Sequence, residues 1–235
     1  CLGCHATRLG ASFGSDPLNP PPELGAGNFV FLTEDNLNDG HAGATNPIPG
    51  DAAGHNINAP SYGVGPDATL TSAPGGTFPA GSMECSSCHD PHGTSEFRLL
   101  YTAGQSVQDG LAVFTEAAPV AEGLPIFFGS ESNSNHTAYQ GGMSAWCGNC
   151  HGDFHANNTK LIHPSGQVLG ATIAQNYNLY NGTDDYLGGT QATAYLAAVP
   201  FEDPANTTSS TAGPTASSQV SCISCHRAHA TSAPD

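Results

Sequence analysis

Residues 85–92 read CSSCHDPH, in which two cysteines are spaced C-x-x-C and a histidine directly follows the second cysteine. The same C-x-x-C-H frame occurs three more times, and the frames together contain all 8 cysteines of the chain: Cys1, Cys4, Cys85, Cys88, Cys147, Cys150, Cys222 and Cys225. C-x-x-C-H is the attachment pattern of c-type haem. Two thiols add across the two vinyl groups of one haem, and the next residue brings an imidazole to the iron. The sequence therefore predicts four covalently bound haem c groups, with proximal iron ligands His5, His89, His151 and His226.

Other uses of paired cysteines explain less of this pattern. A Cys4 or Cys2His2 zinc site does not need a histidine directly after every second cysteine. A disulfide framework in a secreted chain accounts for the even number of cysteines but not for the histidines. Thioredoxin-like redox motifs would not occur four times without a βαβ pattern.

The remaining histidines are candidates for the sixth position of each iron. Of the 11 histidines, seven are left after the proximal four, whereas the chain has only 2 methionines. We therefore predict two imidazoles on every iron, which keeps the reduction potential low, and a packing role for Met143. His92 and His229 each follow a proximal histidine by three positions, so each can reach a neighbouring haem but not the far face of its own. The predicted distal ligands are His92, His229, His163 and His55, with His155 and His136 in reserve.

The charge balance excludes two classes of partner. The chain has Lys+Arg 4 against Asp+Glu 20, which gives a formal net charge of −16. Four basic residues cannot neutralise a run of nucleic-acid phosphates, and such an acidic chain is repelled by an anionic membrane surface. No stretch approaches the roughly 18 consecutive apolar residues of a membrane span. In an acidic haem protein the rare arginines are candidate partners of haem propionates, and these are Arg227, Arg98 and Arg8.

The apolar content is too thin for an ordinary side-chain core. Hydrophobic residues make up 38% of the chain, against 29 glycines and 18 prolines, so the polypeptide alone would struggle to offset its ordering entropy. Haem can supply the missing apolar surface. We therefore predict a mostly irregular fold with long loops, few short helices and strands, and a haem-filled core. The spacing of the motifs suggests one tetrahaem domain over 1–235, with haems 1 and 2 in residues 1–135 and haems 3 and 4 in residues 136–235.

Three local expectations follow from shorter patterns. The apolar runs 29–32 and 126–128 are either strands or haem-contact loops, because periodicity cannot separate these at such length. Residues 192–199 are predicted to form a short helix. Residues 206–218, rich in Ser, Thr, Ala and Gly, are predicted to form a surface loop.

Several stretches resemble secreted multihaem cytochromes and, more narrowly, the outer-surface cytochromes of metal-reducing bacteria. That group includes tetrahaem proteins that polymerise into extracellular nanowire filaments. The resemblance covers the chain well from His55 onward and the first 50 residues poorly. It rests on GHNINAP (54–60), APGGTFPAGSMECSSCHDPHG (73–93), FRLL (97–100), GGMSAWCGNCHGDFH (141–155), HPSG (163–166), VPFEDP (199–204) and CISCHRAHA (222–230).

The resemblance implies an electron carrier and not an enzyme, with haems stacked in a continuous chain. It further implies a homopolymeric filament, in which one subunit can supply a histidine, such as His41 or His136, to a haem of the next. Its other partners would be redox proteins or extracellular acceptors, and its location the cell surface or exterior. Because c-type haem is attached outside the cytoplasm, we expect a secretion signal to have preceded the mature chain.

Two other functions stay open on sequence grounds. A soluble periplasmic tetrahaem shuttle needs about half this length, so the extra loop favours a protein with interfaces. A multihaem nitrite or sulfite reductase needs an open iron position and groups that handle a bound oxyanion. The surplus of histidines and the acidic charge both argue against that enzyme.

Overall fold

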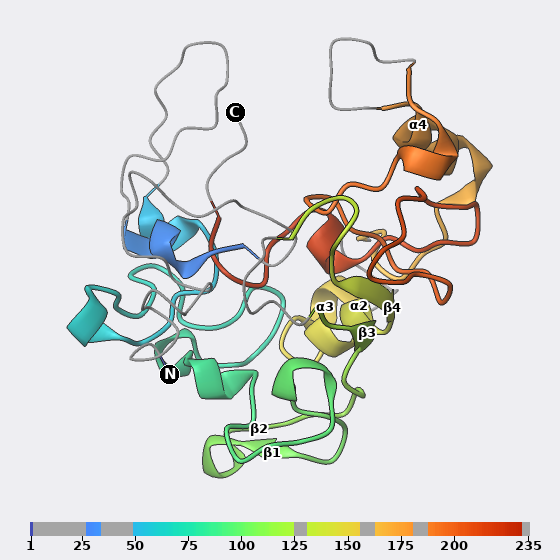
Figure 1. Cartoon of the computed structure of the whole chain (residues 1–235). Helices are drawn as coiled ribbons and strands as arrows, with labels where there is room; N and C mark the ends of the chain where they lie inside the picture. Colours follow the sequence, from blue (N-terminus) through green and yellow to red (C-terminus); the bar gives the residue numbers. More distant parts are fainter. Residues whose placement is uncertain (2–26, 34–48, 125–130, 156–162, 181–187, 232–235) are drawn as a thin grey trace.

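The computed structural model describes residues 1, 27–33, 49–124, 131–155, 163–180 and 188–231 (Figure 1). Within these ranges the helices are α2 (Met143–Cys147), α3 (Gly152–His155) and α4 (Gly170–Leu179). The strands are β1 (Ser106–Val107), β2 (Ala112–Val113), β3 (Val120–Glu122) and β4 (Ala138–Gly141). All other described residues lie in turns, irregular segments and short 3-10 helices. The prediction of a mostly irregular chain with few short helices and strands is confirmed.

The 3-10 helices punctuate the irregular segments at short intervals. They are η1 (Phe29–Thr33), η2 (Gly50–Ala52), η3 (Pro60–Tyr62), η4 (Ala80–Ser82), η5 (Cys85–Ser87), η6 (Phe97–Leu99), η7 (Gln108–Gly110), η8 (Gln191–Thr193) and η9 (Cys222–Ser224). No helix in the described ranges has the length and apolar character that a bilayer crossing requires.

The strands form two separate antiparallel pairs. β1 pairs with β2 in the register Ser106↔Val113, and η7 closes the hairpin between them. β3 pairs with β4 with an irregularity between Val120 and Ala121. In Figure 1 the β1–β2 hairpin and α4 lie at opposite ends of the view.

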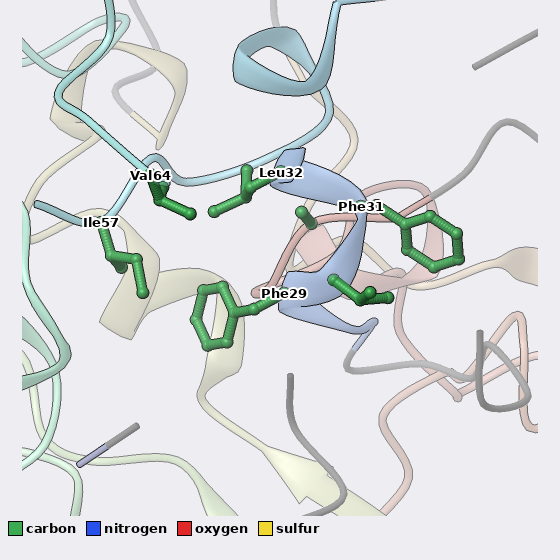
Figure 2. Close-up of a cluster of buried hydrophobic side chains, with 7 residues drawn as sticks. Phe29, Phe31, Leu32, Ile57 and Val64 are labelled. Atoms are coloured by element: carbon green, nitrogen blue, oxygen red, sulfur yellow. The ribbon is translucent and has the colours of Figure 1, made fainter. Parts of the chain in front are cut away.

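Buried apolar side chains gather in small clusters, as expected for a chain with so few of them. The first cluster joins η1 to residues 57–64, and Figure 2 shows the side chains of Leu32 and Val64 facing each other. Residues 29–32 are therefore a buried 3-10 turn, so the strand alternative for this run is wrong. Met143 packs with Tyr139 and Ile223, which confirms its packing role. The run 126–128 lies outside the described residues.

The helix predicted over 192–199 is wrong beyond Thr193. The backbone N–H groups that such a helix would use for its own turns bind other segments. Tyr195 N donates to Thr211 O at 3.0 Å, and Ala197 N donates to Asn133 Oδ1 at 2.8 Å. Tertiary hydrogen bonds thus outweigh local helix propensity here.

The helix α4 was not predicted, because its sequence GATIAQNYNL lacks a regular apolar stripe. Its only buried residue is Ala174.

The two predicted halves also touch: Asn28 N donates to Ala230 O at 2.6 Å, although these residues lie in different halves. The division into two haem-pair halves stays a prediction.

Replacing Phe201 with alanine should lower the free energy of unfolding by about 3–5 kcal/mol, since the ring is buried and the surrounding structure cannot refill the space. Phe201 is 4% exposed and packs against Tyr177 and Tyr195, with ring centroids 5.7 and 5.4 Å away. Guanidinium unfolding followed by circular dichroism measures the loss. Val120→Ala, at a position 63% exposed, is the control and should change the free energy by less than about 0.5 kcal/mol. Equal losses in the two variants would contradict this packing.

Candidate functional site

Each described C-x-x-C-H motif closes one helical turn. The histidine N–H donates to the carbonyl oxygen of the first cysteine, at 3.0 Å for His89, 3.0 Å for His151 and 2.9 Å for His226. At the start of η5 and η9, Glu84 N donates to Ser87 Oγ at 2.9 Å and Ser221 N donates to Ser224 Oγ at 3.0 Å, which fixes the chain as it enters each turn. Both cysteines and the histidine therefore lie on one short turn, as the haem-attachment pattern requires.

The described cysteines form neither disulfides nor a metal cluster. Cys1, Cys85, Cys88, Cys147, Cys150, Cys222 and Cys225 are all outside disulfides. Among the described residues no group of three or more His, Cys, Asp or Glu side chains could hold a metal ion. The described residues thus offer no support for the zinc and disulfide alternatives. Cys4, His5 and Arg8 of the first motif region, and His41, lie outside it.

The cysteines of successive motifs lie close enough to affect one another's pKa. Burial, with smaller contributions from the nearby Cys150 and Cys85, raises the pKa of the Cys88 thiol to about 12. A hydrogen bond with Cys222, together with burial, raises the pKa of Cys147 well above its usual range. The second motif therefore lies beside the third, and the third beside the fourth.

Three histidines present one ring nitrogen to a backbone carbonyl. His89 Nδ1 lies 2.8 Å from Arg98 O, and His151 Nδ1 lies 2.7 Å from Pro74 O. Since a carbonyl can only accept, Nδ1 carries the proton in each ring, and Nε2 is the nitrogen that can ligate a metal. A backbone carbonyl in this role is typical of metal-binding histidines. His55 has the same arrangement, with its Nδ1 2.7 Å from Ala228 O.

Two predicted proximal histidines each face a predicted distal one. The ring centroids of His55 and His151 are 5.9 Å apart with an interplanar angle of 24°. Those of His163 and His226 are 6.5 Å apart at 37°. Two metal–nitrogen bonds of about 2 Å each, with half an imidazole ring on either side, separate two ring centres by about 6 Å. The spacing of both pairs therefore fits one iron between the rings.

The protonation and burial of these rings also fit an iron ligand. Burial lowers the pKa of His55, with smaller contributions from His151 and His226, so its neutral and ligating form is favoured. His163 Nδ1 is buried and has no hydrogen-bond partner among the described residues. A buried polar atom of this kind is costly unless a group absent from the polypeptide accounts for it.

The third motif is held in place by a glycine segment before the second motif. Gly75 O accepts a hydrogen bond from Asp153 N at 2.8 Å. A Cβ added to Gly76 would overlap the carbonyl oxygen of Cys150. Only glycine at position 76 allows this approach, and the approach brings Pro74 O to His151.

The other candidate ligands have different surroundings. The side chain of His92 is 94% exposed, and its Nδ1 lies 3.3 Å from Asp90 Oδ1. The His229 ring stacks on Phe29 at a centroid distance of 4.1 Å. His155 ends α3, and its side chain is not among the described ones.

His136 is fully buried and stacks on Tyr195 at a centroid distance of 3.6 Å. Its Nδ1 lies 2.9 Å from Thr137 O, and its Nε2 lies 2.8 Å from Ser210 O. Because both ring nitrogens face carbonyl oxygens, neither points to a space where iron could bind. This geometry favours a packing role for His136 over its reserve role as a ligand.

The arginines mostly bind the protein itself. Arg98 Nη2 donates to Thr137 Oγ1 at 3.1 Å. Arg227 Nη2 donates to Ala198 O at 2.5 Å, while its Nε is buried without a hydrogen-bond partner among the described residues. The Nε of Arg227 could therefore bind a propionate, which keeps this residue the better of the two candidates. Arg8 is not described.

Sequence reasoning did not identify the polar residues that join the motifs. Glu202 is 2% exposed, and its Oε1 accepts a hydrogen bond from Met143 N at 2.7 Å, at the start of α2. Burial raises the pKa of Glu202. Ser144 Oγ, on the same helix, accepts a hydrogen bond from Cys222 N at 3.3 Å. Their residue types are common in loops, so no sequence pattern distinguishes them.

Comparison with known proteins finds a matching family model and a similar curated protein. The family model described as a doubled CXXCH motif matches residues 78–109. The C-type cytochrome OmcS of Geobacter sulfurreducens is 37% identical over 237 residues, which cover 79% of this chain and 55% of that protein. The chain thus spans about half the length of this curated relative.

Two solved structures are similar over almost the whole chain. An Outer Membrane Cytochrome S filament from Geobacter sulfurreducens has a TM-score of 0.77 and 32% identity, covering 98% of this chain and 71% of that one. The OmcS nanowires from the same organism, solved by cryo-EM, have a TM-score of 0.76, 32% identity and the same coverage of 98% and 71%.

Gly76→Ala should push the glycine segment off the third motif and lower the free energy of unfolding by about 1–3 kcal/mol, the usual cost of overpacking. The midpoint of thermal unfolding measures the effect. Gly65→Ala is the matched control, because an added Cβ there meets no atom within 4 Å. If both variants unfold at the same temperature, the close approach of residue 76 to Cys150 is not a constraint on the fold.

Proposed function

Because the chain belongs to the multihaem c-type cytochromes, we propose that it carries electrons between haems that its C-x-x-C-H motifs hold in series. The observation that carries this proposal is that hydrogen bonds join successive motifs: Cys222 N donates to Ser144 Oγ just before the third motif, and Tyr101 binds both Cys88 O and Trp146 Nε1. Thioether bonds tie each haem to its motif, so neighbouring motifs keep neighbouring haems within short range. This series comprises the second, third and fourth motifs, and therefore three of the four predicted haems.

When bound, haem supplies an iron that gains or loses one electron. The chain holds that iron and sets its potential. We assign His151 and His55 to one iron and His226 and His163 to another, on the spacing of their rings. The carbonyl bonds at Nδ1 of His55 and His151 orient each Nε2 and increase its basicity. Two imidazoles on one iron favour a low potential.

The other two irons keep their predicted ligands. His5 and His89 are the proximal histidines of the first and second motifs. His92 and His229 are the distal candidates for these two positions. Because the side chain of His92 is 94% exposed, it can reach a haem that the described residues do not enclose. Four haems per chain is accordingly the stoichiometry that we propose.

Electron transfer fits the site better than reduction of a substrate. A histidine pair at the third and at the fourth motif leaves no iron position open for a substrate there. The net charge of −16 also repels the anions that a nitrite or sulfite reductase must bind.

We further propose that the chain is the subunit of an extracellular filament. Its similarity to an Outer Membrane Cytochrome S filament extends over 98% of its length, which supports assembly with copies of itself. Secretion to the cell surface follows from such an assembly. A soluble periplasmic shuttle is the alternative.

Removing a distal histidine should leave one iron with a single imidazole. His55→Ala and His163→Ala should each convert one haem from low-spin to high-spin, as seen by electron paramagnetic resonance of the oxidised protein. His136→Gln is the matched control and should leave all haems low-spin, because the nitrogens of His136 bind carbonyls. A fully low-spin His55→Ala protein would exclude His55 as a ligand of the third haem, and the same result for His163→Ala would exclude His163.

Electron microscopy of the purified protein tests the filament. We expect ordered fibres at neutral pH, with four haems per chain by pyridine haemochrome absorbance. Monodisperse monomers under all conditions would favour the shuttle. Fewer than four haems per chain would contradict the proposed stoichiometry. The micrographs would still decide separately whether the chain assembles into filaments.

A further inference from the structure

The segment 101–116, which contains the β1–β2 hairpin, contacts the second C-x-x-C motif through two hydrogen bonds. Tyr101 N donates to Cys88 O at 3.1 Å. Gln108 Nε2, in η7 at the tip of the hairpin, donates to Ser87 Oγ at 3.1 Å, between the two cysteines of that motif. One end and the tip of the segment are therefore attached to the second motif.

The same segment is also attached to the third motif. Asn149 lies between Cys147 and Cys150, and its Oδ1 accepts hydrogen bonds from Thr115 N at 2.8 Å and Glu116 N at 3.0 Å. Trp146, directly before Cys147, donates Nε1–H to Tyr101 O at 2.8 Å. Tyr101 thus binds the second motif through its N–H and the third through its carbonyl.

The segment is stiff enough to transmit these attachments. β1 and β2 are paired, and Val107 in β1 and Phe114 directly after β2 are 0% and 2% exposed. The Phe114 ring packs between Tyr101 and Trp146, with centroid distances of 5.7 and 5.5 Å. A packed aromatic row of this kind resists sliding, because interiors are close-packed.

We propose that residues 101–116 form a brace that sets the spacing and tilt between the haems of the second and third motifs, with Trp146 and Asn149 as its positioning residues. This proposal rests on the proposed function. Each haem is tied covalently to its motif, so a displaced motif moves its haem. The third and fourth motifs need no brace, since Ser144 Oγ binds Cys222 N directly. Asn149 and Ser87 occupy the inner positions of C-x-x-C, which the attachment chemistry leaves open to any residue.

Four variants of the haem-loaded full chain test the brace. Asn149→Ala removes the acceptor of the Thr115 and Glu116 bonds, whereas Asn149→Asp keeps an oxygen there. Trp146→Phe keeps an aromatic ring but removes the N–H that binds Tyr101. Ser86→Ala is the control: it changes an inner C-x-x-C position whose side chain binds Glu84 at 3.3 Å and not the brace.

The readout is circular dichroism in the Soret band, where coupled haems give a two-signed signal that depends on their distance and angle. Asn149→Ala and Trp146→Phe should lose a large part of this signal at an unchanged haem content and an unchanged low-spin spectrum. Asn149→Asp should restore it, and Ser86→Ala should retain it in full. Recovery with aspartate separates positioning from a general loss of stability.

A Soret signal unchanged in both Asn149→Ala and Trp146→Phe, at full haem content, would overturn the brace and leave the proposed function intact. If Asn149→Ala does not fold, the Trp146→Phe signal decides alone. A wild-type chain without covalent haem would instead overturn the proposed function itself, so the two failures are distinguishable.

Discussion

In each described C-x-x-C-H motif, the histidine amide returns to the carbonyl of the first cysteine four residues back, as His151 does to Cys147 at 3.0 Å. That hydrogen bond closes a turn in which two thiols and one imidazole project from a few ångströms of backbone. The rest of the structure depends on these turns. The third and fourth are joined directly through Ser144 and Cys222, and the second and third through residues 101–116.

The irregular character of the chain follows from what these turns need around them. Backbone carbonyls of Pro74, Arg98 and Ala228 orient the rings of His151, His89 and His55. A carbonyl oxygen inside a regular helix or sheet already accepts a backbone hydrogen bond, so the carbonyls of irregular segments are the more readily available acceptors for these rings. Residues 194–199 are irregular for a related reason, because the amides of Tyr195 and Ala197 bind Thr211 O and Asn133 Oδ1.

Neighbouring motifs are joined in two different ways. The third and fourth share a direct contact, in which Ser144 binds Cys222 while the buried carboxyl of Glu202 holds the start of α2. The second and third are joined through an inserted hairpin. Both arrangements use neutral side chains or a carboxyl group whose pKa burial raises, which avoids uncompensated charge beside the attachment points.

The sequence by itself predicted the attachment cysteines and the proximal histidines and determined the irregular fold class, because thioether chemistry and the one-turn spacing are local and leave a readable pattern. It also singled out His55 and His163 as candidate ligands, but not which iron each would serve, and it kept His136 in reserve. Only the tertiary structure set His55 against His151 and His163 against His226, turned both nitrogens of His136 to carbonyls, and connected two motifs through Trp146 and Asn149. Those contacts join residues far apart in the chain, and their partners are backbone carbonyls, which every residue carries and which no sequence pattern can distinguish.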